Sequence, residues 1–234
     1  MGKNFNLLIF VDPRDFSRYD EGMKIKILTL LSLLSLSPLS YSLETVTTGE
    51  EQELTQSNMV RKVNWKEGYI WPEVRILTVL DHLPQDNLNE FLNFETHKTY
   101  IPDMLESKVI KKISPNELNV YFEMEMPWPV KKTTHVTHNL ITKNNDGSYT
   151  LKWNLVKADM LSATDGFMRF YPYKGKTLLE YVSHIVPNSS LASMFKNRVA
   201  DDVEKSVKKI VKHLNNTLNK RENLSATTQK TNNL

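Results

Sequence analysis

The spacing of hydrophobic residues changes its period near Pro187. From Leu118 to Ile185 apolar and polar residues alternate over short segments separated by turns, which predicts antiparallel strands. From Leu191 to Leu218 apolar residues recur at steps of three and four, which predicts one long amphipathic helix. Such a helix would be about 40 Å long at ~1.5 Å per residue, enough to cross a whole sheet. The pattern therefore predicts an α+β fold in which a curved antiparallel sheet wraps around a long C-terminal helix.

The strands are predicted one by one from the same alternation. The clearest is 118–126, whose apolar residues alternate with polar ones, and the pattern continues after a Pro-Trp-Pro turn with Val136, His138 and Leu140. A tight turn at Asn144–Gly147 separates this segment from the next, in which Tyr149, Leu151, Trp153 and Leu155 face one way. The segments 166–171 and 177–185 form one more hairpin. Because His138 shares the parity of its apolar neighbours, we expect its side chain to face inward.

The first half of the chain is less regular. Residues 43–60 are polar and without period, which predicts a flexible lead-in. Residues 63–79 predict one or two strands with a break at Trp71-Pro72, because proline cannot serve a central ladder. Two short helices follow, at Asp86–Phe94 and Glu95–Tyr100, and then a strand at Leu105–Ile113. Beyond Lys220 the chain is polar, and we expect a disordered tail over 220–234.

The order of residues near the start is that of a secretory signal. Met23–Lys26 is a short basic segment, an apolar stretch follows, and Ser40 and Ser42 place small residues before a cut at Leu43. The apolar stretch is short for a membrane span, which needs roughly 20 residues. We therefore expect a signal peptide over 23–42, an upstream extension over 1–22, and export to the periplasm or the exterior. An uncleaved anchor is the alternative.

Composition removes several classes of function. The chain has no cysteine, so it holds no disulfide, thiolate nucleophile or cysteine metal site. Its formal net charge of +3 gives no support to nucleic-acid binding, which calls for a clustered basic face. There is no Gly-x-Ser-x-Gly elbow and no glycine-rich phosphate loop. His135 and His138 would point to opposite faces of a strand and make a poor metal pair. No metal or other cofactor is expected.

Several short motifs resemble those of one superfamily. The turn Met126-Pro127-Trp128-Pro129-Val130 is similar to the "P-x-P-(V/L)-x-x-R-(D/E)" turn of the polyketide cyclase and lipid-transport branch of START-like (SRPBCC) proteins. The segments Gly166–Phe170 and Thr177–Tyr181, Trp153, and Pro187 before the last helix also fit. The resemblance covers roughly 61–219 and implies a helix-grip fold. One departure is that Thr133-Thr134 stands where the family has Arg-Asp, which puts any role of that charged pair in doubt.

This resemblance implies a cavity for a hydrophobic molecule such as a lipid, sterol or isoprenoid. Members of the superfamily mostly bind such ligands, and some carry out ring closure or hydrolysis in the same cavity. We expect a monomer, a gate formed by Leu88–Tyr100 and Lys157–Asp165, and transient membrane contact through the basic face of the last helix. The expected lining residues are Phe122, Met124, Met126, His138, Trp153, Met168, Phe170, Tyr181, Met194, Phe195 and Arg198.

Two alternatives remain open at this level. The same methionine-rich and aromatic rows suit a solid core as well as a cavity, because methionine is flexible enough for both. The chain would then be an interaction protein without a pocket. An enzyme of the cyclase or hydrolase kind would need an inward acid or base, and His138 is the residue whose parity fits that role. A carrier without catalysis is the prediction favoured over both.

Overall fold

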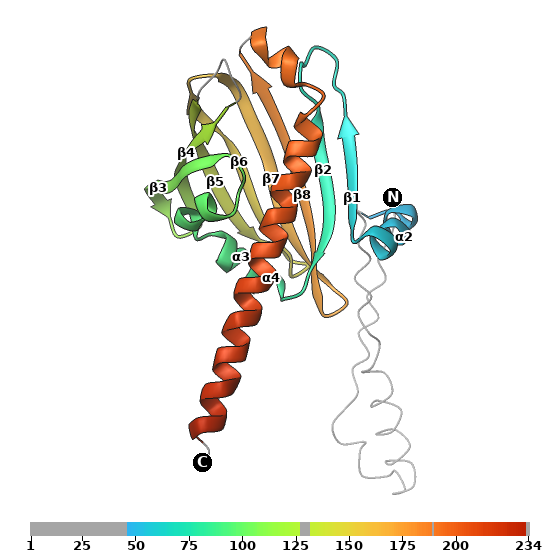
Figure 1. The fold of residues 1–234 in the computed structure, drawn as a ribbon, viewed down its shortest axis with the longest axis vertical. Helices are drawn as coiled ribbons and strands as arrows, with labels where there is room; N and C mark the ends of the chain where they lie inside the picture. Colours follow the sequence, from blue (N-terminus) through green and yellow to red (C-terminus); the bar gives the residue numbers. More distant parts are fainter. Residues whose placement is uncertain (1–45, 127–131, 189, 233–234) are drawn as a thin grey trace, which may run out of the picture. The chain divides into compact units, whose positions relative to one another are not determined.

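The computed structural model describes residues 46–126, 132–188 and 190–232. The expected upstream extension, the signal peptide and the Pro-Trp-Pro turn lie outside the described residues. Eight strands form one antiparallel sheet in the order β1-β2-β8-β7-β6-β5-β4-β3 (Figure 1). In chain order they are β1 (Met59–Asn64), β2 (Glu73–Leu80), β3 (Met104–Ser114), β4 (Glu117–Glu125), β5 (Lys132–Lys143), β6 (Tyr149–Ala158), β7 (Leu161–Tyr173) and β8 (Lys176–Pro187).

Helices complete the architecture. The long helix α4 (Val199–Asn232) runs across one face of the sheet, and its last turns extend beyond the sheet (Figure 1). The others are α2 (Thr48–Ser57), α3 (Pro84–Phe91), and the 3₁₀ helices η2 (Phe94–Thr99) and η3 (Ser190–Phe195). The predicted α+β class, with a curved antiparallel sheet, a long C-terminal helix and two short helices after the first strands, is confirmed.

The main core lies between the inner face of the sheet and the helices α3, η2 and α4. Sheet residues such as Leu151, Met168 and Phe170 are at most 1% exposed and pack in one cluster with Ile210 and Leu214 of α4. Burying a side chain of this size contributes roughly 1.5–3 kcal/mol. The spacing of three and four along α4 therefore serves the purpose predicted from sequence, since it directs one apolar stripe onto the sheet.

The expected flexible lead-in over 43–60 is wrong, because the chain forms helix α2 there and enters β1 at Met59. The helix has local polar support that hydrophobic periodicity does not detect. Thr47 and Glu50 form a capping box, in which the Glu50 amide donates to Thr47 Oγ1 at 3.3 Å and the Thr47 amide donates to Glu50 Oε2 at 2.8 Å. Glu50 is itself buried and paired with Arg75 of β2, so α2 is held against the sheet by charge as well.

The predicted single helix over 191–218 is in fact two elements. Residues 190–195 form η3, and α4 begins at Val199. The expected disordered tail is also wrong, since α4 continues to Asn232. The sequence beyond Leu218 contains no Gly or Pro that would end a helix. Arg221 is paired with the buried Glu90 of α3 at 2.6 Å, which ties the helix down past the sheet edge.

Candidate functional site

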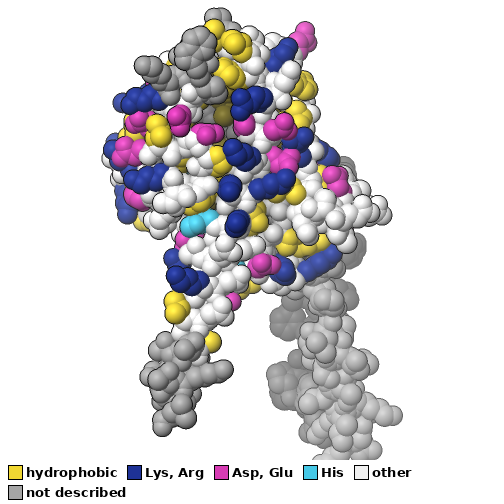
Figure 2. All heavy atoms as spheres, viewed as in Figure 1, with side chains coloured by type: hydrophobic (Ala, Val, Ile, Leu, Met, Phe, Trp, Pro, Cys, Tyr) yellow, Lys and Arg dark blue, Asp and Glu magenta, His cyan; other side chains and the backbone are white. Residues whose placement is uncertain are grey.

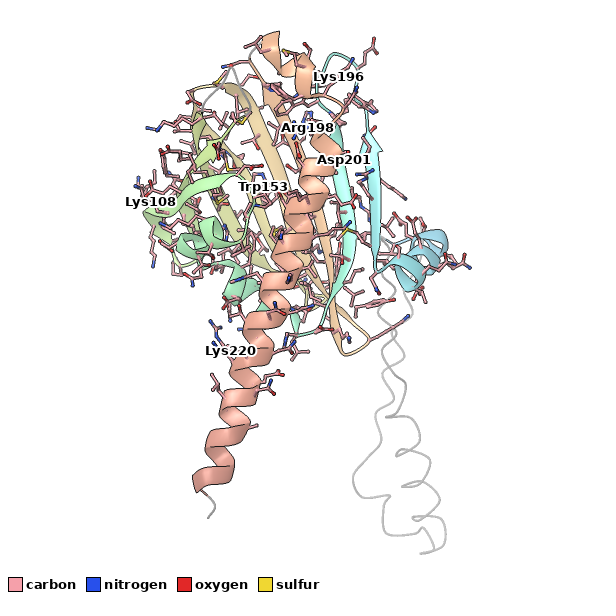
Figure 3. All side chains as sticks on the ribbon, in the orientation of Figure 1. Lys108, Trp153, Lys196, Arg198, Asp201 and Lys220 are labelled. Carbon is pink, nitrogen blue, oxygen red and sulfur yellow. The ribbon has the colours of Figure 1, made fainter. Side chains whose placement is uncertain are left out.

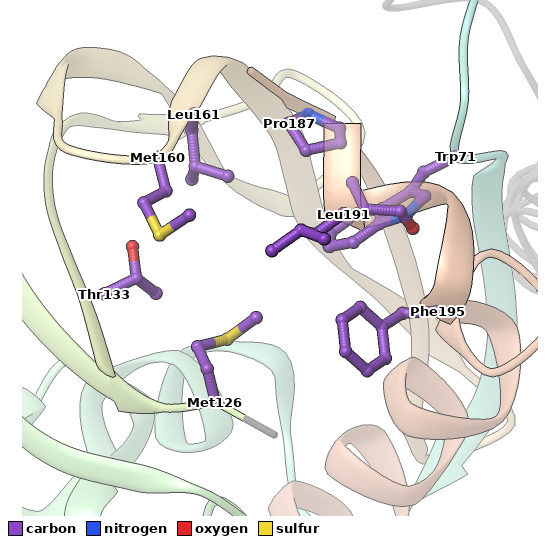
Figure 4. A pocket seen from close by; sticks show the side chains of 9 residues that line it. Trp71, Met126, Thr133, Met160, Leu161, Pro187, Leu191 and Phe195 are labelled. Carbon is purple, nitrogen blue, oxygen red and sulfur yellow. The ribbon is translucent and has the colours of Figure 1, made fainter. Parts of the chain in front are cut away.

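An apolar pocket lies at the end of the sheet where η3 meets the tips of the strands (Figure 4). It holds about 40 Å³ of space. Its lining comes from the β1–β2 loop, the ends of β4 and β8, the start of β5, the β6–β7 turn and η3. The lining residues are Trp71, Met126, Thr133, Met160, Leu161, Pro187, Leu191, Ala192 and Phe195, of which only Thr133 and Trp71 carry a polar side-chain atom.

Trp71 fixes one wall of the pocket. Its indole Nε1 donates a buried hydrogen bond to the carbonyl oxygen of Ala192 at 2.8 Å, which joins the β1–β2 loop to η3. Trp71, Ala192 and Val199 form a small apolar cluster, with Phe195 packed against it. The contacts of η3 therefore include one aromatic side chain and one directional hydrogen bond from the β1–β2 loop.

Asp159 organises the opposite wall, in the β6–β7 turn. Its carboxylate accepts from the Thr133 hydroxyl at 2.6 Å and from the Thr134 amide at 3.0 Å, so the start of β5 is joined to the turn. Burial alone would raise the pKa of Asp159, but these hydrogen bonds outweigh it and lower the pKa. The ionised carboxylate is thus the form that holds Met160 and Leu161 in place beside the pocket.

The structure places the expected lining residues in several different settings. Met126 and Phe195 line the pocket. Phe122, Trp153 and Tyr181 lie on the inner face and are partly buried against the main core, and Trp153 projects from β6 on the side that α4 crosses (Figure 3). Met124 is partly buried at the position opposite Thr133 in the β4–β5 pair. Met168 and Phe170 are fully buried core residues.

Met194 and Arg198 do not reach the pocket. Met194 is 66% exposed on η3. Arg198, just before α4 (Figure 3), points to solvent and approaches Asp202 at 3.9 Å. Both were placed inside because a single helix was expected from Leu191 onward. The break after η3 changes the helical phase, and these two side chains turn outward as a result.

His138 faces outward, and the expectation that it faces inward is wrong. Its Nε2 lies 2.7 Å from Glu117 Oε1, and its strand partner on β4 is Asn119. The inner face of β5 is polar: Thr133, His135, Thr137 and Asn139 stand opposite inward residues of β4, and Leu140 lies on the outer face. Apolar alternation therefore identified the wrong face of this strand, and the acid or base expected of an enzyme cannot be His138.

The aromatic surface formed by Trp153 and Tyr181 on the inner face depends on one glycine. Trp153 pairs with Gly166 across β6 and β7, and a Cβ on Gly166 would lie 2.5 Å from the indole Cζ2. The ring can lie over the strand because no side chain occupies that position. Its centroid is 5.6 Å from that of Tyr181, so the two rings form a continuous surface on the inner face.

Only one of the two expected gates borders the pocket. The turn within Lys157–Asp165 contributes Met160 and Leu161. The segment Leu88–Tyr100 instead packs into the main core, where Leu88 and Phe94 are at most 3% exposed. Sequence reasoning missed Trp71, Pro187, Leu191 and Ala192 as lining residues. Trp71 lies in a loop, Pro187 at the end of β8, and Leu191 and Ala192 in a short 3₁₀ helix. Periodicity carries little information about direction in such places, although Trp71-Pro72 did mark a break.

Other kinds of site receive no support from the described residues. Within 46–126, 132–188 and 190–232, no group of three or more His, Asp or Glu could hold a metal ion. No helix in those ranges combines the length and the apolar character that a membrane crossing needs. His97 is buried, its pKa is lowered to about 4 by burial, and its Nε2 lies 2.7 Å from the carbonyl oxygen of Phe91. It is therefore a neutral structural histidine.

No protein-family model and no curated protein sequence matches this chain. Solved structures with a similar fold do exist. A STAR-related lipid transfer protein from Xanthomonas axonopodis is similar with a TM-score of 0.62 and 20% identity, over 68% of this chain and 94% of that one. Human StAR-related lipid transfer protein 5 is similar with a TM-score of 0.53 and 8% identity, over 86% of this chain and 100% of that one. The Zhui aromatase/cyclase from Streptomyces sp. R1128 is similar with a TM-score of 0.52 and 8% identity, over 61% and 92%. At these identities the likeness establishes the fold.

Proposed function

Because the chain has a START-like helix-grip fold, we propose that it is an exported carrier of a hydrophobic ligand, a lipid, sterol or isoprenoid, held between the sheet and α4. Two of the solved structures with this fold carry lipid transfer in their names. The observation that carries the proposal is the apolar pocket at the end of the sheet. Further along the inner face, Phe122, Trp153 and Tyr181 are only partly buried. Each methylene buried there would contribute about 0.8 kcal/mol.

Ligand entry requires the pocket to open. A volume of about 40 Å³ is far below the roughly 300–1,000 Å³ of small-molecule sites, so the pocket must widen to hold a ligand. The element best suited to move is η3, because it is held by the Trp71–Ala192 hydrogen bond and a small apolar cluster. Displacement of η3 would uncover the partly buried Phe195, beside Leu191, which is already 38% exposed, and would connect the pocket to the inner face of the sheet.

Exchange of ligand at a membrane surface fits the exposed residues around this end. Trp65, Tyr69 and Ile70 of the β1–β2 loop are 39–54% exposed, and Met194 of η3 is 66% exposed. Figure 2 shows hydrophobic side chains at this end, whereas basic and acidic side chains are mixed over the face below it. Tryptophan and tyrosine favour the interface between lipid and water. Export is proposed from the signal-like order of Met23 to Ser42.

The first experiment is native mass spectrometry on the chain exported from a bacterial host and purified without detergent. A discrete extra mass that is lost on extraction with organic solvent is the expected result, and it would identify the ligand class. The delipidated protein is then titrated with the same extract. Phe195→Glu should abolish rebinding by placing a charge in the pocket, whereas Met194→Glu, one residue away and exposed, should rebind normally. A clean mass with no rebinding by the unmodified chain would contradict the carrier function.

Membrane contact is tested separately by sedimentation with vesicles of phosphatidylcholine and phosphatidylglycerol. The double substitution Trp65→Ser and Met194→Ser should leave the protein in the supernatant. Leu83→Ser removes a similarly exposed apolar side chain, at 57% exposure, from the segment between β2 and α3. It should sediment like the unmodified chain. Equal sedimentation of all three proteins would exclude this end as the membrane-facing surface.

A further inference from the structure

The inner face of the sheet contains a polar atom with no partner. His135 of β5 faces inward opposite Phe122 of β4, and the two rings stack with centroids 5.1 Å apart. The imidazole Nδ1 is buried and makes no hydrogen bond. On the other side of Phe122, Ser107 of β3 is 2% exposed and its hydroxyl is likewise unpartnered. Two such atoms beside one aromatic ring are unusual in a core, where buried polar groups nearly always find partners.

The surroundings of His135 are polar, and the charge that acts on it is the negative carboxylate of Asp159. Further along the inner face of β5, the Asn139 Nδ2 group donates to Thr137 Oγ1 at 2.9 Å, so these two side chains satisfy each other. Among the described residues, the inward-facing positions of β4 to β8 carry no Asp, Glu or Arg, and the Lys among them is Lys143 at the far end of β5, opposite Tyr149. Burial lowers the pKa of His135 to about 4, despite the opposing effect of Asp159, so its imidazole is neutral near pH 7.

His135 is also placed where a ligand could reach it. Thr133 lines the pocket, and His135 is the next inward-facing residue along the same strand. A molecule that entered from the pocket along β5 would therefore meet Thr133 first and His135 next. A hydroxyl or carbonyl at that depth would supply the missing hydrogen bond. A carboxylate or phosphate there would lose its hydration and find no compensating charge.

We propose that the interior recognises its apolar ligand through one uncharged polar group, a hydroxyl or a carbonyl, that is hydrogen-bonded to His135. This inference rests on the proposed carrier function and narrows it. The ligand class becomes neutral amphiphiles, such as alcohols, sterols and quinone-like carbonyl compounds. Lipids whose charged group would have to enter the interior are excluded. Because the imidazole can donate from one nitrogen and accept at the other, either a hydroxyl or a carbonyl can pair with it.

The test compares three ligands of equal chain length: dodecan-1-ol, dodecanoate and dodecane. Each is titrated against the delipidated full chain at neutral pH, and binding is followed by native mass spectrometry. We expect the alcohol to bind about three- to tenfold more tightly than the alkane, which is the effect of one neutral hydrogen bond. The carboxylate should bind at least about tenfold more weakly than the alcohol, because its charge would be buried unpaired.

Variants on the same strand provide the controls. His135→Leu should bind the alkane as well as the unmodified chain does and lose the preference for the alcohol. His135→Gln keeps a donor and an acceptor at this position and should restore the preference, which a merely structural role would not predict. His138→Leu, on the outer face of β5, should leave all three affinities unchanged. Unfolding curves of each variant confirm that the folded state is retained.

The outcomes separate the two proposals. If all three ligands bind equally and His135→Leu changes nothing, the role of His135 is refuted while the carrier function stands. Tighter binding of dodecanoate than of dodecan-1-ol would also refute the role of His135. If none of the three ligands binds the unmodified chain, the carrier function itself is contradicted, and the inference about its ligand fails with it.

Discussion

Replacement of Gly166 by alanine is a sharp test of how the sheet and its aromatic surface are built. A Cβ at this position would lie 2.2 Å from the carbonyl oxygen of Val182 and 2.5 Å from Cζ2 of Trp153. The oxygen belongs to the backbone of β8, which is paired on both sides, so it cannot move without disturbing neighbouring strands. The indole must therefore leave its position and the strands must separate locally.

The cost of this substitution can be built from two effects. Overpacking in a well-packed interior costs roughly 1–3 kcal/mol. Loss of the contact between Trp153 and Tyr181, whose centroids are 5.6 Å apart, adds about 0.5–1.5 kcal/mol. Gly166→Ala should therefore lower the free energy of unfolding by about 3 kcal/mol. This loss is a large part of the roughly 5–15 kcal/mol by which a domain is stable.

Urea unfolding followed by circular dichroism measures this loss directly, and tryptophan fluorescence reports the displacement of the indole. Gly49→Ala is the matched control, because Gly49 lies in the first turn of α2 and a Cβ there would meet nothing within 4 Å. It should be neutral or stabilise the protein by up to about 1 kcal/mol. Equal midpoints for Gly166→Ala and the unmodified chain would refute the close approach of Trp153 to β7.

Three further predictions concern burial and charge. Burial lowers the pKa of His97 and of His135 to about 4 from 6.5, so the unfolded chain binds protons first as the pH falls. The contribution of these two histidines to the free energy of unfolding is fully present above pH 6.5. It should fall by about 1.4 kcal/mol per pH unit for each histidine as the pH drops toward 5. Urea midpoints that stay constant over this window would contradict the prediction. Arg75→Leu leaves the buried carboxylates of Glu50 and Glu180 without their shared cation and should cost roughly 3–5 kcal/mol in the same assay. Trp71→Phe removes the hydrogen bond to η3 and should speed hydrogen exchange there, with about 1 kcal/mol lost; unchanged exchange in η3 would show that this bond does not hold it.

Alternation predicted the sheet well where inward residues are apolar. The rows at 118–124 and 149–155 face the core as expected, because apolar side chains there pack against α4 and η2. The same rule failed on β5. Its inward residues Thr133, His135, Thr137 and Asn139 are polar, while Leu140 is 42% exposed on the outer face. A strand that carries polar groups into the interior cannot be oriented from hydrophobicity alone.

The pocket was harder to predict than the fold. Most of its lining comes from loops, turns and a short 3₁₀ helix, which bring together residues as distant in sequence as Trp71 and Ala192. No local period relates such residues. Met126 and Phe195 were predicted because they extend a strand row and a helical stripe. The rest depend on how the strand tips converge, which is a property of the whole sheet.

The strand order has a consequence for how the chain folds. The first two strands pair with each other, but β2 completes its other edge only with β8, about a hundred positions later in the chain. The hairpin of β1 and β2 and the helix α2 therefore cannot join the rest of the sheet until the last strand has been synthesised. The apolar face of β2 is buried only when α4 packs against it. Contacts this distant in sequence favour slow, late folding. Strands β3 to β7 can pair with their neighbours in chain order, but the hairpin of β1 and β2 can join the sheet only after β8 has been synthesised.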